Sequence, residues 1–297
     1  SDRGGGAPVI PFGLDPAVEA EMRKMGYVMN QELVEKTRAL FAERKNFDLP
    51  PGAAMHKDLV YGDHPRQRLD ICALPGSGHP VALFVPGGGF NGGDKGFYSH
   101  VPHFFARSGF VGAAVNYRLA PEFLFPSGAE DVSRALDWIA GNVQHHGGDP
   151  ARLFVVAQSA GAVHAASTLF DPAYQPACLP SIRAAALMSG LYEIEADMDA
   201  PNANLYFGTD PALYRRRSSA QHASQSKLPV LMTLAELEPP FFAVQAAALL
   251  RELGRRVGGA PPFAWLKGHN HLSPVLGMGG PGDQLGDAIL TEFRRYA

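Results

Sequence analysis

The spacing of apolar and polar positions changes near residue 50. Before it, a start signal at Asp15 and Pro16 opens a region whose apolar side chains recur at helical spacing. We expect two helices between residues 16 and 44, separated near Gly26. Core packing explains the three methionines of this pattern more simply than substrate contact does. The apolar positions are Val18, Met22, Met25, Met29, Leu33, Leu40 and Phe41.

After residue 50, short apolar runs alternate with helical segments, which is typical of an α/β fold. The predicted strands are 57–61, 68–73, 81–85, 111–117, 153–157, 184–188, 230–234 and 263–266. The predicted helices are 98–107, 129–144, 161–169, 241–253 and 283–296. The first two strands are too close for a crossover and should form an antiparallel hairpin, whereas the later ones suit a parallel sheet. The segment 191–226 has little clear period and indicates a binding-loop insertion.

Composition excludes several classes of protein. The 297 residues include 26 Lys and Arg against 29 Asp and Glu, a net charge of −3, which argues against a polybasic nucleic-acid binder. Apolar residues at 46% and charged residues at 19% indicate a folded chain rather than a disordered one. No run approaches the roughly 18 apolar residues of a membrane span. Two cysteines are too few for a disulfide framework, so we expect a cytoplasmic location, with a removed leader left open.

A serine stands at the junction of a strand and a helix. The apolar run 153–157 leads into Gln158, Ser159, Ala160 and Gly161. Small residues on both sides of such a serine allow the strand and the helix to approach closely while the hydroxyl stays exposed, as in a nucleophile elbow. The usual pattern is G-x-S-x-G, and Ala157 replaces its first glycine. On local sequence alone, a helix N-cap explains Ser159 equally well.

A glycine run follows the strand at 81–85. It reads Pro86-Gly87-Gly88-Gly89-Phe90, and backbone N–H groups in such a run are suited to binding a developing oxyanion. The same glycines fit a dinucleotide fingerprint, but no acidic residue ends the next strand, where Asn116 stands instead. An oxyanion hole is therefore the better interpretation.

These motifs and the run 116–126 together resemble the hormone-sensitive-lipase-like branch of the α/β-hydrolase superfamily, from about residue 57 to the C-terminus. The resemblance implies the order serine, acid, histidine. It assigns the acid to Glu238, with Glu236 as runner-up, and the base to His271, with His269 as runner-up. It also implies that Gly88, Gly89 and Ala160 donate to the oxyanion.

The sequence therefore predicts an α/β-hydrolase fold with a mostly parallel eight-stranded sheet flanked by helices. Residues 1–50 should form an arm and a helical cap, and residues 51–297 the catalytic domain. We expect a serine carboxylesterase for short to medium acyl or aryl esters, without cofactor or metal. Its partner should be a small-molecule ester and not nucleic acid, with homo-oligomers left open. An arylformamidase-like amide hydrolase and a non-catalytic binding protein stay as alternatives. The pocket walls should include the cap helices, Phe90, Leu205, Tyr206 and Phe207.

Overall fold

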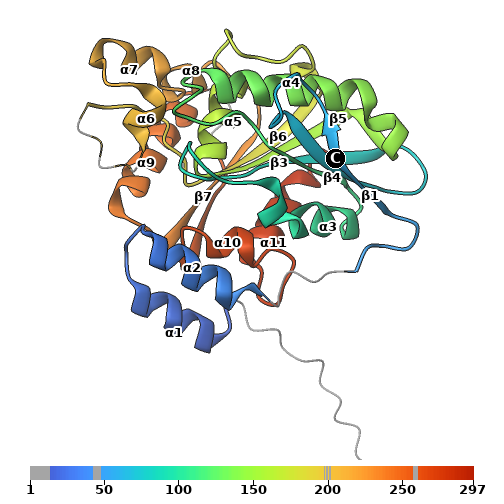
Figure 1. Ribbon diagram of the computed structural model, residues 1–297, viewed down its shortest axis with the longest axis horizontal. Helices are drawn as coiled ribbons and strands as arrows, with labels where there is room; N and C mark the ends of the chain where they lie inside the picture. Colours follow the sequence, from blue (N-terminus) through green and yellow to red (C-terminus); the bar gives the residue numbers. More distant parts are fainter. Residues whose placement is uncertain (1–13, 43–47, 197, 199, 201, 257–259) are drawn as a thin grey trace, which may run out of the picture.

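An eight-stranded sheet forms the centre of the molecule, in the order β1-β2-β4-β3-β5-β6-β7-β8 (Figure 1). The computed structural model describes residues 14–42, 48–196, 198, 200, 202–256 and 260–297. The strands are β1 (Ala54–Val60), β2 (Arg68–Ala73), β3 (His79–Val85), β4 (Val111–Val115), β5 (Gly148–Gln158), β6 (Ile182–Met188), β7 (Val230–Leu237) and β8 (Phe263–Asn270).

The strand pairing confirms the predicted fold class. β1 and β2 form the expected antiparallel hairpin, and β2 also pairs antiparallel with β4. From β4 through β3 to β8 every neighbouring pair is parallel. The carboxyl ends of these parallel strands therefore meet at one edge of the sheet, where α/β folds place their ligand sites.

Helices cover both faces of the sheet (Figure 1). They are α1 (Pro16–Met25), α2 (Gln31–Leu40), α3 (His100–Arg107), α4 (Ser127–Asn142), α5 (Ala160–Phe170), α6 (Ala203–Phe207), α7 (Pro211–Arg217), α8 (Ala220–Ala223), α9 (Pro240–Gly254), α10 (Ser273–Leu276) and α11 (Gln284–Phe293). Short 3-10 helices are η2 (Lys95–Tyr98), η3 (Val143–His146) and η4 (Leu179–Ser181).

The central strands are apolar on both faces because each face has its own core. In β3, Leu83 and Val85 belong to the core that α4 and α5 cover, whereas Ala82 and Phe84 belong to the core that α3 and α11 cover. Successive side chains of a strand point to opposite faces, so a strand buried on both sides has a continuous apolar sequence. This explains why the central strands were predictable from short apolar runs.

The segment 191–226 differs from its prediction as a loop insertion. It contains the three short helices α6, α7 and α8. Asp210 caps α7 by accepting a hydrogen bond from the Ala212 amide at 3.0 Å. Helices of this length contain too few residues to show a clear apolar period, so the sequence pattern did not reveal them.

Two predicted helices, α1 and α2, form the N-terminal part of the described chain. Leu14, Met22 and Leu33 join the core that α3, α10 and α11 cover. α1 packs against β8, and α2 packs against α10. The division of the chain at residue 50 stays a prediction. No helix in the described part of the chain has both the length and the apolar character needed to cross a membrane.

Candidate active site

Ser159 occupies a strained turn between β5 and α5. Its φ of 54° and ψ of −125° are unusual for a residue with a side chain. The amide of Ser159 donates to the carbonyl of Met188 at 2.8 Å. A Cβ added to Gly161 would lie 2.2 Å from the carbonyl oxygen of Val85, so only glycine permits this approach of α5 to β3. The Ser159 side chain makes no capping hydrogen bond to α5, so the N-cap alternative does not describe it.

His271 and Glu238 form a buried pair at the ends of the last two strands. Nδ1 of His271 lies 2.5 Å from Oε1 of Glu238. The other carboxylate oxygen, Oε2, accepts hydrogen bonds from the Ser189 hydroxyl and the Ala235 amide, both at 2.9 Å. The carboxylate is therefore oriented from both sides, as a group that holds a histidine ring in one tautomer must be.

The second ring nitrogen of His271 is available for chemistry. Within the described part of the chain, Nε2 of His271 is buried without a hydrogen-bond partner. The ring of Phe242 stacks on the imidazole, with the centroids 4.3 Å apart. Ser159 and His271 line the same cavity. The arrangement places a hydroxyl and an unpaired imidazole nitrogen in one space, as proton transfer from a serine nucleophile requires.

The structure gives the two runner-up residues other contacts. The Glu236 carboxylate accepts a hydrogen bond from the Gly268 amide at 2.7 Å and pairs with Arg23 of α1 at 2.9 Å. Burial raises its pKa, but these two contacts outweigh that effect and leave it below the ordinary value. Nδ1 of His269 lies 2.8 Å from the Ser273 hydroxyl, and burial lowers the pKa of His269 to about 4. Neither residue contacts the pair of Glu238 and His271 through these bonds.

The glycine run after β3 forms a tight turn beside Ser159. Gly88 and Gly89 have φ values of 156° and 59°, and the Gly92 amide donates to the Gly88 carbonyl at 3.0 Å. The Tyr117 hydroxyl anchors the start of the run by donating to the Pro86 carbonyl at 2.7 Å. Within the described residues, the amides of Gly88 and Gly89 donate no hydrogen bond. Both glycines and Ala160 line the cavity with Ser159, so the predicted oxyanion donors lie together.

The cavity has a volume of about 400 Å³. Its walls include Phe90 and residues of the helical cap. The prediction for Leu205, Tyr206 and Phe207 is wrong, because none of them is among the described lining residues. Tyr206 instead stacks behind Phe90, with the ring centroids 4.8 Å apart and the planes 3° from parallel. Phe207 also contacts the Phe90 ring, with the centroids 5.7 Å apart, so Tyr206 and Phe207 support the wall from behind.

Several lining residues were not predicted. Phe241 and Phe242 lie in the first turn of α9, three and four residues after Glu238. Their closeness to Glu238 in the sequence could have predicted that they line the cavity. Leu191, Ala200 and Asn202 come from the segment after β6. The cap was expected to contribute, but not by individual residues; those that line the cavity are Met29, Asn30, Gln31, Val34 and Arg38, so for Met29 the interpretation as core packing alone is wrong.

A buried histidine, which the sequence indicates as packed or exposed rather than catalytic, lies behind the glycine run. His164 of α5 contacts the rings of Phe90, Tyr117 and Tyr206, with centroid distances of 5.7, 4.5 and 5.0 Å. Burial lowers its pKa to about 3. The ring is therefore neutral at physiological pH and serves as packing. Among the described residues, no group of three or more His, Cys, Asp or Glu side chains is arranged to hold a metal ion.

Comparison with known proteins agrees with this architecture. Residues 82–257, more than half of the chain, match the family described as the alpha/beta hydrolase fold. The chain is 30% identical over 238 residues to the probable carboxylic ester hydrolase LipM of Mycobacterium tuberculosis, covering 77% of this chain and 51% of that protein. It is 37% identical over 119 residues to a probable isoprenylcysteine alpha-carbonyl methylesterase of Oryza sativa, covering 39% and 28%.

Solved structures show the same fold. The hyperthermophilic esterase from Pyrobaculum calidifontis superimposes with a TM-score of 0.72 at 21% identity, covering 95% of this chain and 98% of that one. Our chain spans about half or less of the two curated relatives named above. The matched family and the shared architecture confirm the resemblance to the hormone-sensitive-lipase-like branch, and the chain belongs to the α/β-hydrolase family.

Proposed function

We propose that the protein is a serine carboxylesterase in which Ser159, His271 and Glu238 act as nucleophile, base and acid. The observation that carries this proposal is the buried pair of His271 and Glu238, since Nε2 of His271 has no hydrogen-bond partner among the described residues and His271 lines the same cavity as Ser159. A neutral imidazole in this position takes the hydroxyl proton, and the Glu238 carboxylate stabilises the imidazolium that forms.

The reaction proceeds in two steps, acylation of Ser159 and hydrolysis of the acyl-enzyme. Ser159 Oγ forms a bond to the acyl carbon as its proton moves to His271 Nε2. The amides of Gly88, Gly89 and Ala160 donate to the resulting oxyanion. When the intermediate collapses, the bond to the alcohol oxygen breaks and that oxygen takes the proton from His271. Water then attacks the acyl-enzyme by the same route and releases the carboxylic acid.

The relatives support this proposal. LipM carries the name of a probable carboxylic ester hydrolase, the matched Oryza sativa protein that of a methylesterase, and the Pyrobaculum calidifontis protein that of an esterase. A small-molecule ester as the partner belongs to the same proposal. A cytoplasmic location and homo-oligomers stay predictions from the sequence.

The test is hydrolysis of 4-nitrophenyl acetate and butyrate at neutral pH. We expect wild type to be active, and Ser159→Ala and His271→Ala each to lose roughly 10³-fold or more in kcat/KM. His269→Ala is the matched control, since it removes the neighbouring buried histidine, and it should keep activity within about tenfold. Loss of activity in His269→Ala with retention in His271→Ala would overturn the assignment of the base.

Two further substrate series define the reaction. We propose short to medium acyl chains because a cavity of about 400 Å³ lies near the lower end of the usual range for ligand sites. Best turnover of a twelve-carbon ester in a chain-length series would contradict this preference. Faster hydrolysis of N-formylaniline than of phenyl acetate would favour an amide hydrolase. An inert wild type would favour a binding protein.

A further inference from the structure

We propose that Arg38 selects esters that carry an anionic oxygen group, a carboxylate or a phosphate, at a distance from the reacting carbonyl. This inference rests on the proposed esterase function and narrows its substrate class. Arg38 belongs to α2, and its side chain is half-buried in the wall of the catalytic cavity.

The charge distribution in the cavity is the first observation. Among the described residues that line it, Arg38 is the only Lys, Arg, Asp or Glu side chain. The wall also contains the apolar side chains of Met29, Val34 and Leu272 and the neutral amide side chains of Asn30, Gln31 and Asn202. None of these groups offsets the charge of the half-buried guanidinium, whereas an anionic ligand would do so.

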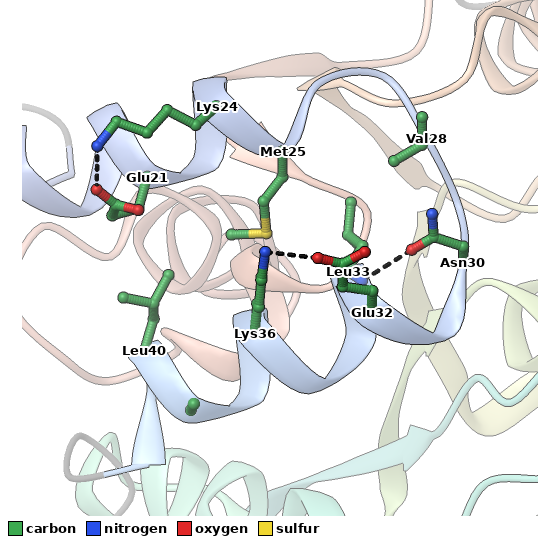
Figure 2. Close-up of a pocket in the computed structure, with 10 residues that line it drawn as sticks. Glu21, Lys24, Met25, Val28, Asn30, Glu32, Leu33, Lys36 and Leu40 are labelled. Atoms are coloured by element: carbon green, nitrogen blue, oxygen red, sulfur yellow. Dashed lines mark hydrogen bonds and ion pairs between the residues drawn. The ribbon is translucent and has the colours of Figure 1, made fainter.

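Arg38 also differs from the other basic residues of its two helices. Arg23 pairs with Glu19 and Glu236. Figure 2 shows the groove between α1 and α2, where Lys24 pairs with Glu21 at 2.5 Å and Lys36 with Glu32 at 2.6 Å. Within the described part of the chain, Arg38 makes no ion pair with a carboxylate.

The contacts of Arg38 hold the guanidinium without neutralising it. Its central carbon lies 4.4 Å from the centroid of the Phe97 ring, in a cation–π contact. Tyr98 lines the same cavity; burial raises the pKa of its hydroxyl, and the nearby positive charge of Arg38 acts to lower it. A guanidinium has five N–H donors in a planar fork, so donors are left to bind a carboxylate or phosphate.

The position of α2 relative to the catalytic base is fixed. The Asn270 side chain donates to the Thr37 hydroxyl at 2.8 Å, and that hydroxyl donates to the Leu33 carbonyl at 2.7 Å. All three residues are buried. Thr37 precedes Arg38 in the chain and Asn270 precedes His271, so these bonds tie the helix that carries the cation to the loop that carries the base. A substrate anion bound by Arg38 would therefore position the ester carbonyl for attack.

The test uses two pairs of matched esters. Mono-4-nitrophenyl adipate and 4-nitrophenyl hexanoate have acyl chains of equal length, and only the adipate ester ends in a carboxylate. 4-Acetoxybenzoate and 4-acetoxyacetophenone place the same contrast on the alcohol side. Within each pair, the ratio of kcat/KM for the anionic ester to that for the neutral ester is compared between variants, which cancels the intrinsic reactivity of the esters. Ser159→Ala supplies the background rate.

We expect Arg38→Met to lower this ratio by roughly 10-fold or more in at least one pair, since a hydrogen bond to a charged group has about this effect. The pair that responds identifies the half of the ester that carries the anion. Arg38→Lys should retain part of the ratio. Lys36→Met is the matched control because it removes one positive charge from the same helix at a residue that lines the groove between α1 and α2 rather than the catalytic cavity, and its ratio should stay within about twofold of wild type.

Unchanged ratios in Arg38→Met, with hydrolysis of the neutral esters still dependent on Ser159, would overturn this inference and leave the esterase proposal intact. If wild type hydrolyses no ester, the esterase proposal fails. In that case the role of Arg38 is tested by the binding of a free dicarboxylate instead of by kinetics. Free adipate should raise the melting temperature of wild type but not of Arg38→Met, with hexanamide as the neutral control. Equal effects of adipate on both proteins would overturn the inference.

Discussion

The floor of the catalytic cavity comes from the sheet, whereas its roof comes from the cap and from the segment after β6. The floor comprises the ends of β3, β5, β7 and β8, with Ser159, Glu238 and His271. The roof comprises α2 with Met29 and Asn30 before it, together with Leu191, Ala200 and Asn202 of the segment after β6. Buried hydrogen bonds orient Glu238 in the floor, whereas the outer side of α2 has exposed ion pairs such as Lys36 with Glu32, and one buried bond, from Asn270 to Thr37, joins α2 to the floor. Under the proposed function, the floor carries out the chemistry and the roof selects the substrate.

The sharpest test of this comparison uses two glutamates that lie two residues apart. Glu238→Gln should lower kcat/KM for 4-nitrophenyl butyrate by roughly 10³- to 10⁴-fold, because a neutral amide cannot stabilise the imidazolium of His271. Glu236→Gln should keep activity within about threefold, since its carboxylate contacts Arg23 and Gly268 instead. Steady-state kinetics of both variants check this, and comparable losses would show that floor and roof are not separable.

The next prediction concerns the stability of the floor. Gly161→Ala should lower the free energy of unfolding by about 1–3 kcal/mol, because its Cβ would collide with the backbone of Val85 and Pro86. Activity should fall with it as Ser159 shifts.

Gly141→Ala is the matched control for this substitution. Gly141 also lies in a helix, but no atom lies within 4 Å of an added Cβ. Alanine there should raise the free energy of unfolding by about 0.5–1 kcal/mol. Urea unfolding measures both variants. Equal effects would show that the approach of α5 to β3 is not constrained.

A third prediction uses the pH dependence of the packing under the floor. The pKa of His164 is lowered to about 3 in the fold, against about 6.5 in the unfolded chain. Between these values the unfolded chain binds the proton and the folded chain does not, so stability falls with falling pH. From pH 7 to pH 5 this contributes a loss of about 2 kcal/mol.

His164→Leu should remove that contribution. The depressed pKa of His269 acts in the same direction and stays in both proteins. Urea unfolding at pH 7 and pH 5 should therefore show a loss in the variant that is about 2 kcal/mol smaller than in wild type. Parallel losses in the two proteins would mean that the folded His164 ring binds a proton.

The smallest expected effect on stability and activity is that of changing Tyr206, which packs behind Phe90 in the cavity wall. Tyr206→Phe removes the hydroxyl that accepts a hydrogen bond from the Gly128 amide at 3.1 Å. We expect a loss of about 1 kcal/mol in the free energy of unfolding, with kcat/KM for 4-nitrophenyl butyrate within about twofold of wild type. A large change in KM without a change in stability would instead place Tyr206 in contact with substrate.

The sequence predicted the floor better than the roof, for a physical reason. Ser159 lies at a junction whose strand is buried on both faces and whose small neighbours follow from backbone contact, so local sequence predicted the junction. It left a helix N-cap open for Ser159, and the glycine run after β3 favoured a nucleophile. Glu238 and His271 were reached through the family resemblance, because local sequence left Glu236 and His269 open.

The roof depends on tertiary contacts that no short window contains. Tyr206 and Phe207 lie behind Phe90 rather than in the cavity, because α6 turns them toward an aromatic cluster. Arg38 lies on a helix with other basic residues, and only the packing of α2 distinguishes it from Lys36. Helical spacing predicted the cap helices but not which of their side chains line the cavity.

One contact within the floor has a consequence for exchange of backbone protons with solvent. The Gln158 side chain donates to the His271 carbonyl at 3.0 Å, and Gln158 directly precedes Ser159. The loop after β8 cannot open without breaking a bond to the end of β5, a central strand of the sheet. Amide protons of residues 268–273 should therefore exchange in the same cooperative unit as those of β5, and more slowly than those of the cap. Each opening event would then disrupt the positions of Ser159 and His271 at the same time, and closing would restore both together.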